Sequence, residues 1–260
     1  MATALSTLMQ SAKDEAGLLT VEVTADWMQG RSVFGGLQAA LALQAMRALV
    51  PDQVLRTLQT TFVAPVAGVV RVRAEILRRG SNATHVEARI VDGAATLAIV
   101  IGVFGAARSS VVAVAPTQPR VEETAAVELP RAGGLPSFTQ HFAVRWLRGQ
   151  VPYTGDTGCE HVLEIALRDQ GKTTEAHVVA IADFIPPIAL THLAAPAPGS
   201  TLTWMLELLV DRVDHLALAG WRVDAQLVAA RDGYTSQSVM VWGPGGVPVA
   251  ISRQSMLVFG

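Results

Sequence analysis

One helical segment limits what this chain can fold into more than any other feature. Residues Gly36 to Val50 carry apolar side chains on two adjoining stripes at helical spacing, and only Gln38, Gln44 and Arg47 are strongly polar. A helix that is apolar nearly all round must be buried nearly all round. Pro51 follows the segment and ends it, because proline cannot continue a helix. The sequence therefore predicts a helix enclosed by other elements.

Alternating segments follow this helix and are suited to enclose it. Over 69–77 and again over 84–91, apolar side chains alternate with charged ones, which is typical of a strand with one buried face. Asp92-Gly93 is a hairpin turn signal, and the apolar run over 96–105 reads as a strand buried on both faces. With a further strand over 58–63, these segments predict an antiparallel meander that curls around the helix.

The stretch 107–136 has a different character, because prolines interrupt it and glutamates add charge. It predicts a linker between an N-terminal unit, residues 1–106, and a C-terminal unit, residues 137–260. The second unit repeats the plan of the first, and each unit ends on Val-Phe-Gly, at 103–105 and at 258–260.

The expected elements of the second unit include two helical segments. They are a strand over 138–147, a helical stretch over 173–184, a short helix over 186–193, and strands over 201–210, 216–229, 235–242 and 247–259. Residues 160–167 fit either a strand or a turn of helix.

Composition narrows the functional classes. The net charge is −2 over 260 residues and the basic residues are scattered, so no nucleic-acid partner is expected. Half of the residues are hydrophobic, which allows a large core. The most apolar run is much shorter than the roughly 20 residues that a spanning helix needs, so no membrane partner is expected. Cys159 is the only cysteine and the N-terminus lacks a signal-peptide pattern, which favours a cytoplasmic location.

Motifs of several common active sites are absent from the sequence. The chain holds no G-x-S-x-G nucleophile elbow, no phosphate-binding loop, no dinucleotide fingerprint, and no histidines or cysteines at metal-ligand spacing. If the chain hydrolyses a substrate, a carboxylate or a histidine must activate the water.

Asp183 stands out among the carboxylates, because it lies between the apolar pairs Ile181-Ala182 and Phe184-Ile185. One interpretation is a helix N-cap, where an aspartate accepts hydrogen bonds from free backbone N–H groups. The other is a general base whose pKa is raised by burial and lowered by a helix N-terminus. Gln254 and Thr203 are further candidates, although a lone glutamine or threonine in a strand is ordinarily a surface or packing residue.

Four short stretches, spread in order along the chain, form a recognisable set. They are Arg31 to Ala40 (RSVFGGLQAA), Thr61 to Pro65 (TFVAP), Ala182 to Leu190 (ADFIPPIAL) and Ile251 to Gln254 (ISRQ). They resemble the first helix, the following strand, the second helix entry and the C-terminal strand of the acyl-CoA thioesterase II family. The resemblance implies an α+β double hot-dog fold, in which two antiparallel sheets each wrap around a central apolar helix and are fused as a pseudo-dimer.

The resemblance also implies an activity, the hydrolysis of acyl-CoA thioesters to free acid and coenzyme A. This reaction requires neither a metal nor an organic cofactor, and coenzyme A is part of the substrate. In that family an Asp, a Thr and a Gln of the second hot dog hold and activate the attacking water. The matching catalytic residues here are Asp183, Thr203 and Gln254, and Thr201, on the same predicted face, stays an alternative to Thr203. A histidine often found in the strand after the first helix is Gln59 here.

Gly35 and Gly36 are the expected substrate-binding residues. Backbone N–H groups at the start of a helix can meet a developing oxyanion, and glycine lets substrate approach the backbone closely. Close packing of the helix against the sheet would require the same glycines, so both interpretations stand. The resemblance further implies a role in fatty-acid metabolism and a homodimer of double hot dogs.

Two other functions are compatible with the same fold. The first is an acyl-thioester binding protein without turnover, because a fold does not determine a function. The second is a hot-dog hydratase or dehydratase, which pairs a carboxylate with a catalytic histidine. The histidine considered for this pair is His192, downstream of Asp183. The complete Asp-Thr-Gln set favours hydrolysis.

Overall fold

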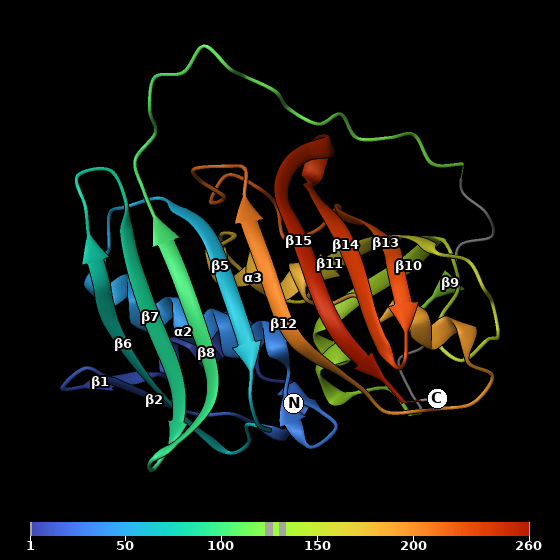
Figure 1. Cartoon of the computed structure of the whole chain (residues 1–260), viewed down its shortest axis with the longest axis horizontal. Coiled ribbons are helices and arrows are strands. Elements are labelled where there is room, and N and C mark those ends of the chain that lie inside the picture. Colours follow the sequence, from blue (N-terminus) through green and yellow to red (C-terminus); the bar gives the residue numbers. More distant parts are fainter. Residues whose placement is uncertain (1, 123–126, 130–133, 260) are drawn as a thin grey trace.

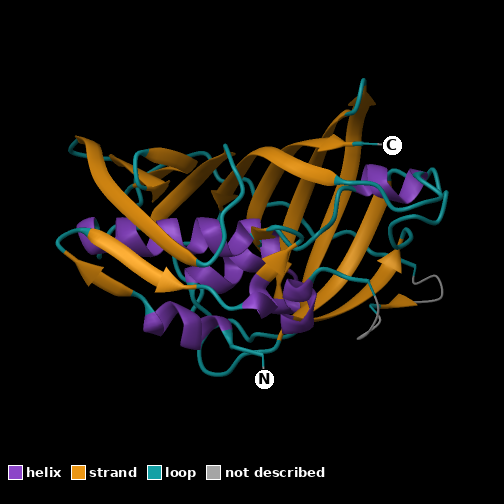
Figure 2. Cartoon of the chain, turned by 90° about the horizontal axis from the view of Figure 1, so that it is seen from below, coloured by secondary structure: helices purple, strands orange, loops and turns teal. Residues whose placement is uncertain are grey.

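A large antiparallel sheet dominates the fold, and the helices lie on one side of it (Figures 1 and 2). The computed structural model describes residues 2–122, 127–129 and 134–259. The strands of the sheet are β1 (Lys13–Glu15), β2 (Leu18–Glu22), β5 (Leu55–Phe62), β6 (Val69–Arg79), β7 (Thr84–Asp92), β8 (Ala95–Phe104), β9 (Val127–Glu128), β10 (Phe142–Arg148), β11 (Glu160–Leu167), β12 (Gly199–Leu208), β13 (Trp221–Arg231), β14 (Tyr234–Gly243) and β15 (Val247–Val258). Across the sheet they follow the order β1-β2-β6-β7-β8-β5-β12-β15-β14-β13-β11-β10-β9.

The remaining elements are short apart from one helix. They are α1 (Leu5–Ser11), α2 (Gly35–Leu49), α3 (Glu175–Ala182), the 3-10 turns η1 (Ala25–Trp27), η2 (Ser137–His141), η3 (Ile188–His192) and η4 (Pro244–Gly246), and the two-stranded ribbon β3 (Met28–Gln29) with β4 (Ser32–Val33).

The sheet consists of two halves with the same connectivity. The first half runs β2-β6-β7-β8-β5 and the second runs β11-β13-β14-β15-β12. In the sequence, α2 is followed by the central strand β5 and then by the meander β6-β7-β8, and α3 is followed by the central strand β12 and then by the meander β13-β14-β15. β5 and β12 pair with each other, from Thr203 opposite Thr61 to Glu207 opposite Thr57. This seam joins the two sheets edge to edge and leaves no open strand edge in the middle of the molecule. The predicted double hot-dog architecture is confirmed.

Helix α2 is enclosed, as its apolar sequence predicts. Every residue from Gly36 to Leu43 is buried, and eight consecutive residues cover all sides of a helix. α3 packs against α2 inside the curve of the sheet. An added Cβ at Gly36 would lie 3.1 Å from the Ala180 Cα and 2.7 Å from a ring atom of Phe34. Glycine at this position therefore lets the two helices approach closely.

The first 34 residues hold elements that the sequence did not predict. α1, β1, β2 and the β3–β4 ribbon are each no longer than seven residues, which is too short for a periodic pattern. Hydrogen bonds to side-chain carboxylates hold this N-terminal segment in place. The Thr3 backbone N–H donates to Asp26 at 2.6 Å, and the Ser6 backbone N–H donates to Asp169 at 2.7 Å.

The second half differs from prediction at two strands and resolves one ambiguous stretch. The strand predicted over 138–147 begins only at Phe142, because the residues before it form the 3-10 turn η2. The ambiguous stretch over 160–167 is a strand, β11, held between β10 and β13. The strand predicted from Leu216 begins only at Trp221, because the chain turns before it and Gly220 has a φ of +81°. A residue in that conformation cannot continue a strand, and glycine adopts it at little cost.

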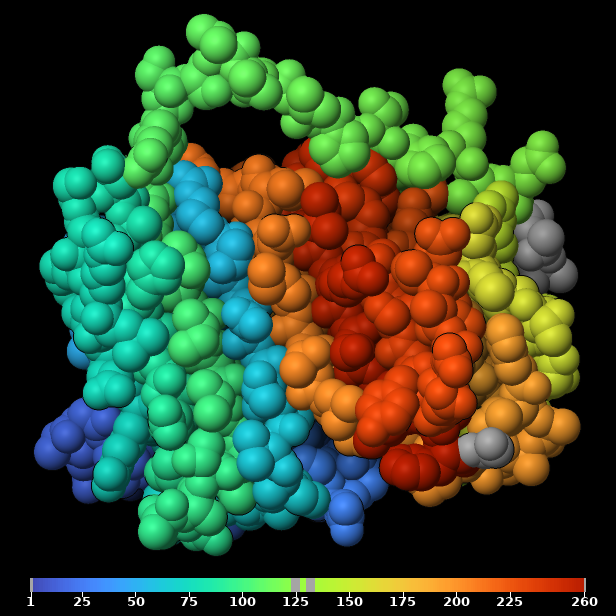
Figure 3. Space-filling view, viewed as in Figure 1, coloured from blue at the N-terminus to red at the C-terminus, as the bar shows by residue number. Residues whose placement is uncertain are grey.

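The linker crosses the end of the second half on its way from β8 (Figures 1 and 3). Arg222 Nη1 donates to the Pro119 carbonyl oxygen at 2.8 Å, which fixes part of it against β13. β9 lies inside the predicted linker range and pairs with β10. Residues 123–126 and 130–133 of that range, and Gly260 at the end of the last predicted strand motif, lie outside the described residues. The domain boundaries at 106 and 137 stay predictions.

Nowhere in the described ranges does a helix have the length and apolar character that crossing a membrane requires.

Replacing Gly36 by alanine tests the importance of the helix contact. We expect Gly36→Ala to lower the free energy of unfolding by about 1–3 kcal/mol, because the new methyl group overpacks against a backbone atom that cannot move freely. Gly199→Ala is the matched control, since its nearest neighbour lies 3.5 Å away, at ordinary contact distance. Chemical denaturation followed by fluorescence measures both. Equal stabilities would contradict the close packing of α2 on α3.

Candidate functional site

Asp183 lies at the end of helix α3. Its backbone N–H donates to the Val179 carbonyl oxygen at 3.3 Å, so it is the C-terminal cap of that helix. The N-cap interpretation is wrong, because the next helical turn begins only at Ile188 and is preceded by Pro187. The chain between them contains Pro186-Pro187, which separates the aspartate from the turn it was expected to cap.

Two hydrogen-bond donors meet the Asp183 carboxyl group, one from each half of the molecule. Gln254 of β15 donates from Nε2 to Oδ1 at 2.6 Å. The Gly36 backbone N–H, in the first turn of α2, donates to the carboxyl as well. Gly35 also lies against the carboxyl group, since a Cβ added to Gly35 would be 2.7 Å from Asp183 Oδ2. The structure thus brings Asp183, Gln254, Gly35 and Gly36 together where α2 begins and α3 ends.

The surroundings of Asp183 change its acidity. Burial raises the pKa of Asp183 to about 7, although the hydrogen bonds from Gly36 and Gln254 act in the opposite direction. The residue is still partly exposed to solvent. A carboxyl group that titrates near neutral pH is suited to accept a proton from a bound reactant.

Aromatic rings supply much of the apolar environment. Phe34 directly precedes Gly35 and stacks on Phe138 of η2, with ring centroids 4.0 Å apart. Phe184 directly follows Asp183 and packs against Phe142 of β10, with centroids 4.7 Å apart. The residues that adjoin Gly35 and Asp183 in sequence therefore meet in one aromatic cluster, in which Phe138 also contacts Phe184.

A further buried glutamine, Gln237 of β14, belongs to the same site. Its Nε2 donates to Gln254 Oε1 at 3.0 Å, and its Oε1 accepts the Ile188 backbone N–H at 3.0 Å. Gln237 lies directly opposite Gln254 in the β14–β15 pair and is fully buried. The sequence motifs did not single out Gln237. The available signal was its inward position in the alternation of β14, in phase with buried Val239 and Val241.

The structure does not bring Thr203 to this site. Thr203 is opposite Ser255 and exposed, whereas its neighbour Trp204 is opposite Gln254 on the inner face. A bulge shifts the register between Thr201 and Thr203, and Thr201 is opposite the buried Met256. Residues directly opposite each other share a face of the sheet, so Thr201 faces inward with Gln254. The prediction that both threonines share a face is wrong, because it assumed unbroken alternation.

Two other sequence features also lie elsewhere. His192 Nε2 is 3.3 Å from the Gly158 carbonyl oxygen, while the hydrogen bonds to Asp183 come from an amide side chain and a backbone N–H. The carboxylate–histidine pair of a hydratase is therefore not formed by these two residues. Gln59 is exposed on β5, opposite Met205 of the seam.

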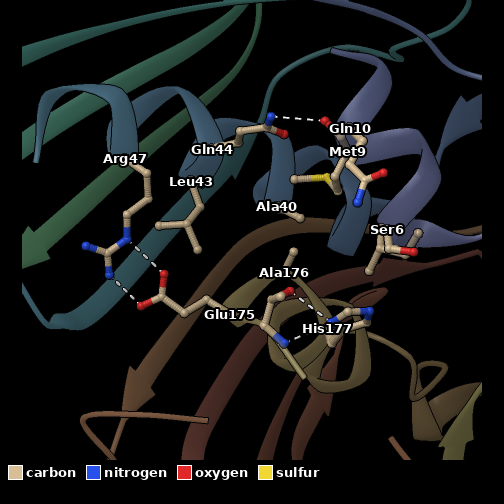
Figure 4. A pocket seen from close by; sticks show the side chains of 12 residues that line it. Ser6, Met9, Gln10, Ala40, Leu43, Gln44, Arg47, Glu175, Ala176 and His177 are labelled. Carbon is tan, nitrogen blue, oxygen red and sulfur yellow. Dashed lines mark hydrogen bonds and ion pairs between the residues drawn. The ribbon is translucent and has the colours of Figure 1, made fainter. Parts of the chain in front are cut away.

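A cavity of about 280 Å³ lies at the opposite end of the helix pair, between α1, α2 and α3 (Figure 4). Its walls are mainly apolar and include Leu43 and Ala176. Polar side chains in its walls have partners, since Arg47 Nε donates to Glu175 Oε2 at 2.9 Å and His177 Nε2 lies 3.1 Å from Asp169 Oδ2. Across the described part of the chain, no set of three or more histidine, cysteine and acidic side chains is placed to hold a metal ion.

Comparisons with solved structures identify the fold. A hot-dog protein from Alicyclobacillus acidocaldarius superposes with a TM-score of 0.87 at 20% sequence identity, covering 100% of this chain and 99% of that one. A tesB protein from Mycobacterium avium superposes at 0.79 with 12% identity, covering 98% of both chains. An acyl-CoA thioesterase II from Mycobacterium marinum superposes at 0.75 with 15% identity, again covering 98% of both. No curated protein sequence matched the chain.

Comparison with family models identifies the family of the chain as well as its fold. The model for the acyl-CoA thioesterase N-terminal domain matches residues 23–105, and the model for the C-terminal domain matches residues 115–258. The two matches follow each other in the order of the family and together span most of the sequence. The chain therefore belongs to the acyl-CoA thioesterase family and is a thioester hydrolase.

Proposed function

We propose that this protein hydrolyses acyl-CoA to a free acid and coenzyme A, with Asp183 as the general base. The observation that carries the proposal is the position of this carboxyl group. It has a pKa of about 7 and lies against the first turn of α2. A base that titrates near the working pH combines a useful ionised fraction with enough proton affinity to activate water.

The chemical steps follow from that assignment. A water molecule attacks the thioester carbonyl carbon while its proton passes to the Asp183 carboxylate. The carbonyl π electrons move onto oxygen and form a tetrahedral oxyanion. When the oxyanion collapses, the C–S bond breaks, and the proton held by Asp183 passes to the sulfur of coenzyme A. The acid leaves as the second product, and the carboxylate is regenerated.

Gln254 and Thr201 would hold the water in place. The Gln254 amide has two N–H donors and one of them is used on Asp183, so the second can reach the water. Thr201 takes the role that the family resemblance implied for Thr203, because Thr201 is on the inner face of the bulged strand. Its hydroxyl can both donate and accept a hydrogen bond, which suits a water that must keep a fixed orientation.

The oxyanion would be stabilised at the start of α2. The first N–H groups of a helix lack intrahelical acceptors and carry a partial positive charge. The Gly36 N–H already binds Asp183, so we assign the oxyanion to its neighbours in the first turn, with Gly35 leaving room for the thioester. The cytoplasmic location, the role in fatty-acid metabolism and the homodimer remain predictions; sedimentation velocity measures the last of these.

Substitution of Asp183 tests the general base. We expect Asp183→Asn to lower kcat for acyl-CoA hydrolysis by about 100- to 10,000-fold, the usual contribution of a positioned base, because the amide cannot accept the proton. Steady-state assays of thiol release over a panel of acyl-CoAs measure it. Asp232→Asn is the control, since that side chain is 77% exposed. Unchanged turnover in Asp183→Asn would refute the assignment. Binding of acyl-CoA by a wild-type protein without turnover would instead support the thioester-binding alternative.

The pH dependence of activity provides a second test. Only ionised Asp183 can accept a proton, and burial raises its pKa to about 7. We therefore expect kcat/KM to rise with pH through a midpoint near 7 and to level off above it, before any loss of the fold at high pH. A rate profile between pH 5 and 9 measures the midpoint. A profile already flat from pH 5 upward would contradict a base with a raised pKa.

The two threonines of β12 form a matched pair for a third test. We expect Thr201→Val to lower kcat by about 3- to 10-fold, the effect of losing one neutral hydrogen bond in the transition state. Thr203→Val should leave kcat within about 2-fold, because its hydroxyl is on the outer face. The same assay compares both. The opposite ranking would return Thr203 to the catalytic set.

A further inference from the structure

We propose that Gln237 is a positioning residue that determines which way round the Gln254 amide lies, and that it thereby keeps a Gln254 N–H directed at Asp183. This inference rests on the proposed function. It adds a residue of β14 that neither the sequence motifs nor the family resemblance singled out.

The hydrogen bonds form a chain with a direction. The Ile188 backbone N–H donates to Gln237 Oε1 at 3.0 Å, Gln237 Nε2 donates to Gln254 Oε1 at 3.0 Å, and Gln254 Nε2 donates to Asp183 Oδ1 at 2.6 Å. A glutamine amide has donors on one side and an acceptor on the other, so each link decides the orientation of the next.

The groups at the two ends of this hydrogen-bond series determine how both amides are oriented. A backbone N–H can only donate, so Gln237 must turn its oxygen toward Ile188 and its nitrogen toward Gln254. Gln254 must then turn its oxygen toward Gln237, which leaves its nitrogen facing Asp183. An ionised carboxylate can only accept, so this orientation is also the one that Asp183 requires. A flip of either amide would set two donors or two acceptors against each other.

The Ile188 backbone N–H is free to donate to Gln237 because it lies at the start of a helical turn. Ile188 is the first residue of η3, and the first N–H groups of a helical turn have no acceptor within it. Gln237 is fully buried and Gln254 is 2% exposed, so bulk water cannot take over either role. The Pro186-Pro187 turn is thereby connected through two side chains to the carboxyl group that precedes it in sequence.

The orientation has a consequence for the ionisation of Asp183. Burial raises the pKa of Asp183, and hydrogen bonds from the Gly36 N–H of α2 and the Gln254 side chain of β15 lower it. Neither of these hydrogen-bond partners titrates. The ring of Phe62, from β5, is the other close neighbour of Gly35 beside the carboxyl. If Gln254 flips, an N–H donor that favours the carboxylate is replaced by an oxygen that favours the protonated acid. A positioning role for Gln237 therefore predicts a change in the pH profile and not only in the rate.

Two substitutions of Gln237 remove its control over the orientation of the Gln254 amide in different ways. Gln237→Met keeps the volume and removes both hydrogen bonds. Gln237→Glu, in its ionised form, keeps an acceptor for the Ile188 N–H but presents an acceptor to Gln254 in place of a donor, so that Gln254 is expected to turn its nitrogen away from Asp183. Gln226 is exposed on the neighbouring strand β13, so Gln226→Met and Gln226→Glu are the matched controls.

The measurement is kcat and KM for one acyl-CoA between pH 5 and 9, with thermal unfolding of each variant. We expect both Gln237 variants to lower kcat by about 10-fold with KM within about 2-fold. We also expect the pH midpoint to move upward by about one unit, the size of one lost hydrogen bond to a carboxylate. The Gln226 variants should match the wild type.

Other outcomes separate the possible failures. A drop in kcat with an unmoved pH midpoint, or loss of the folded state in both variants, would make Gln237 a structural residue and overturn the inference. Full activity of both variants at every pH would overturn it as well. Failure of the proposed function is recognised separately, because Asp183→Asn would then retain its turnover whatever the Gln237 variants do.

Discussion

The close contact between α2 and α3 is the constraint on which the rest of the structure depends. The two helices run antiparallel, with Gly35 beside Asp183 at one end and Arg47 beside Glu175 at the other. Only glycine at position 36 allows the Ala180 backbone to come so near. Since this contact sets the start of one helix against the end of the other, it determines that the carboxyl group of one half meets the free N–H groups of the other half. Neither half alone contains the site.

This arrangement also explains why the site needs so many polar partners. Burial removes water from around the Asp183 carboxyl group, and a buried amide without partners costs roughly 1–3 kcal/mol. The fold meets that cost with an ordered series of donors from Ile188, Gln237 and Gln254 that ends on Asp183. The series stabilises the carboxylate without adding a cation, so the pKa of Asp183 stays raised, in the range where a base can both lose and gain a proton.

The sequence predicted the parts of this structure that repeat and missed those that break a repeat. Helix α2 and the strands β6, β7 and β8 have long periodic patterns, and their predicted ranges agree with the structure to within a few residues. The family resemblance located Asp183 and Gln254, which the structure brings together. Thr203 could not be corrected from the sequence, because a β-bulge in β12 reverses the faces and has no residue signature there. Gln237 could be recognised only once β14 was paired with β15 in register, since its partner is 17 residues away in the chain.

The opposite end of the helix pair shows what distinguishes a reactive carboxylate from a structural one. Glu175 lies there at the start of α3, beside the last turn of α2, in a position that mirrors Asp183. It is paired with Arg47, which also donates to the carbonyl oxygen of Val50 at 3.0 Å and so fixes the end of α2. The arginine occupies both carboxylate oxygens with hydrogen bonds, which suits a structural link between the two halves. At Asp183 the partners are uncharged, and the same helix geometry therefore supports chemistry at one end and stability at the other.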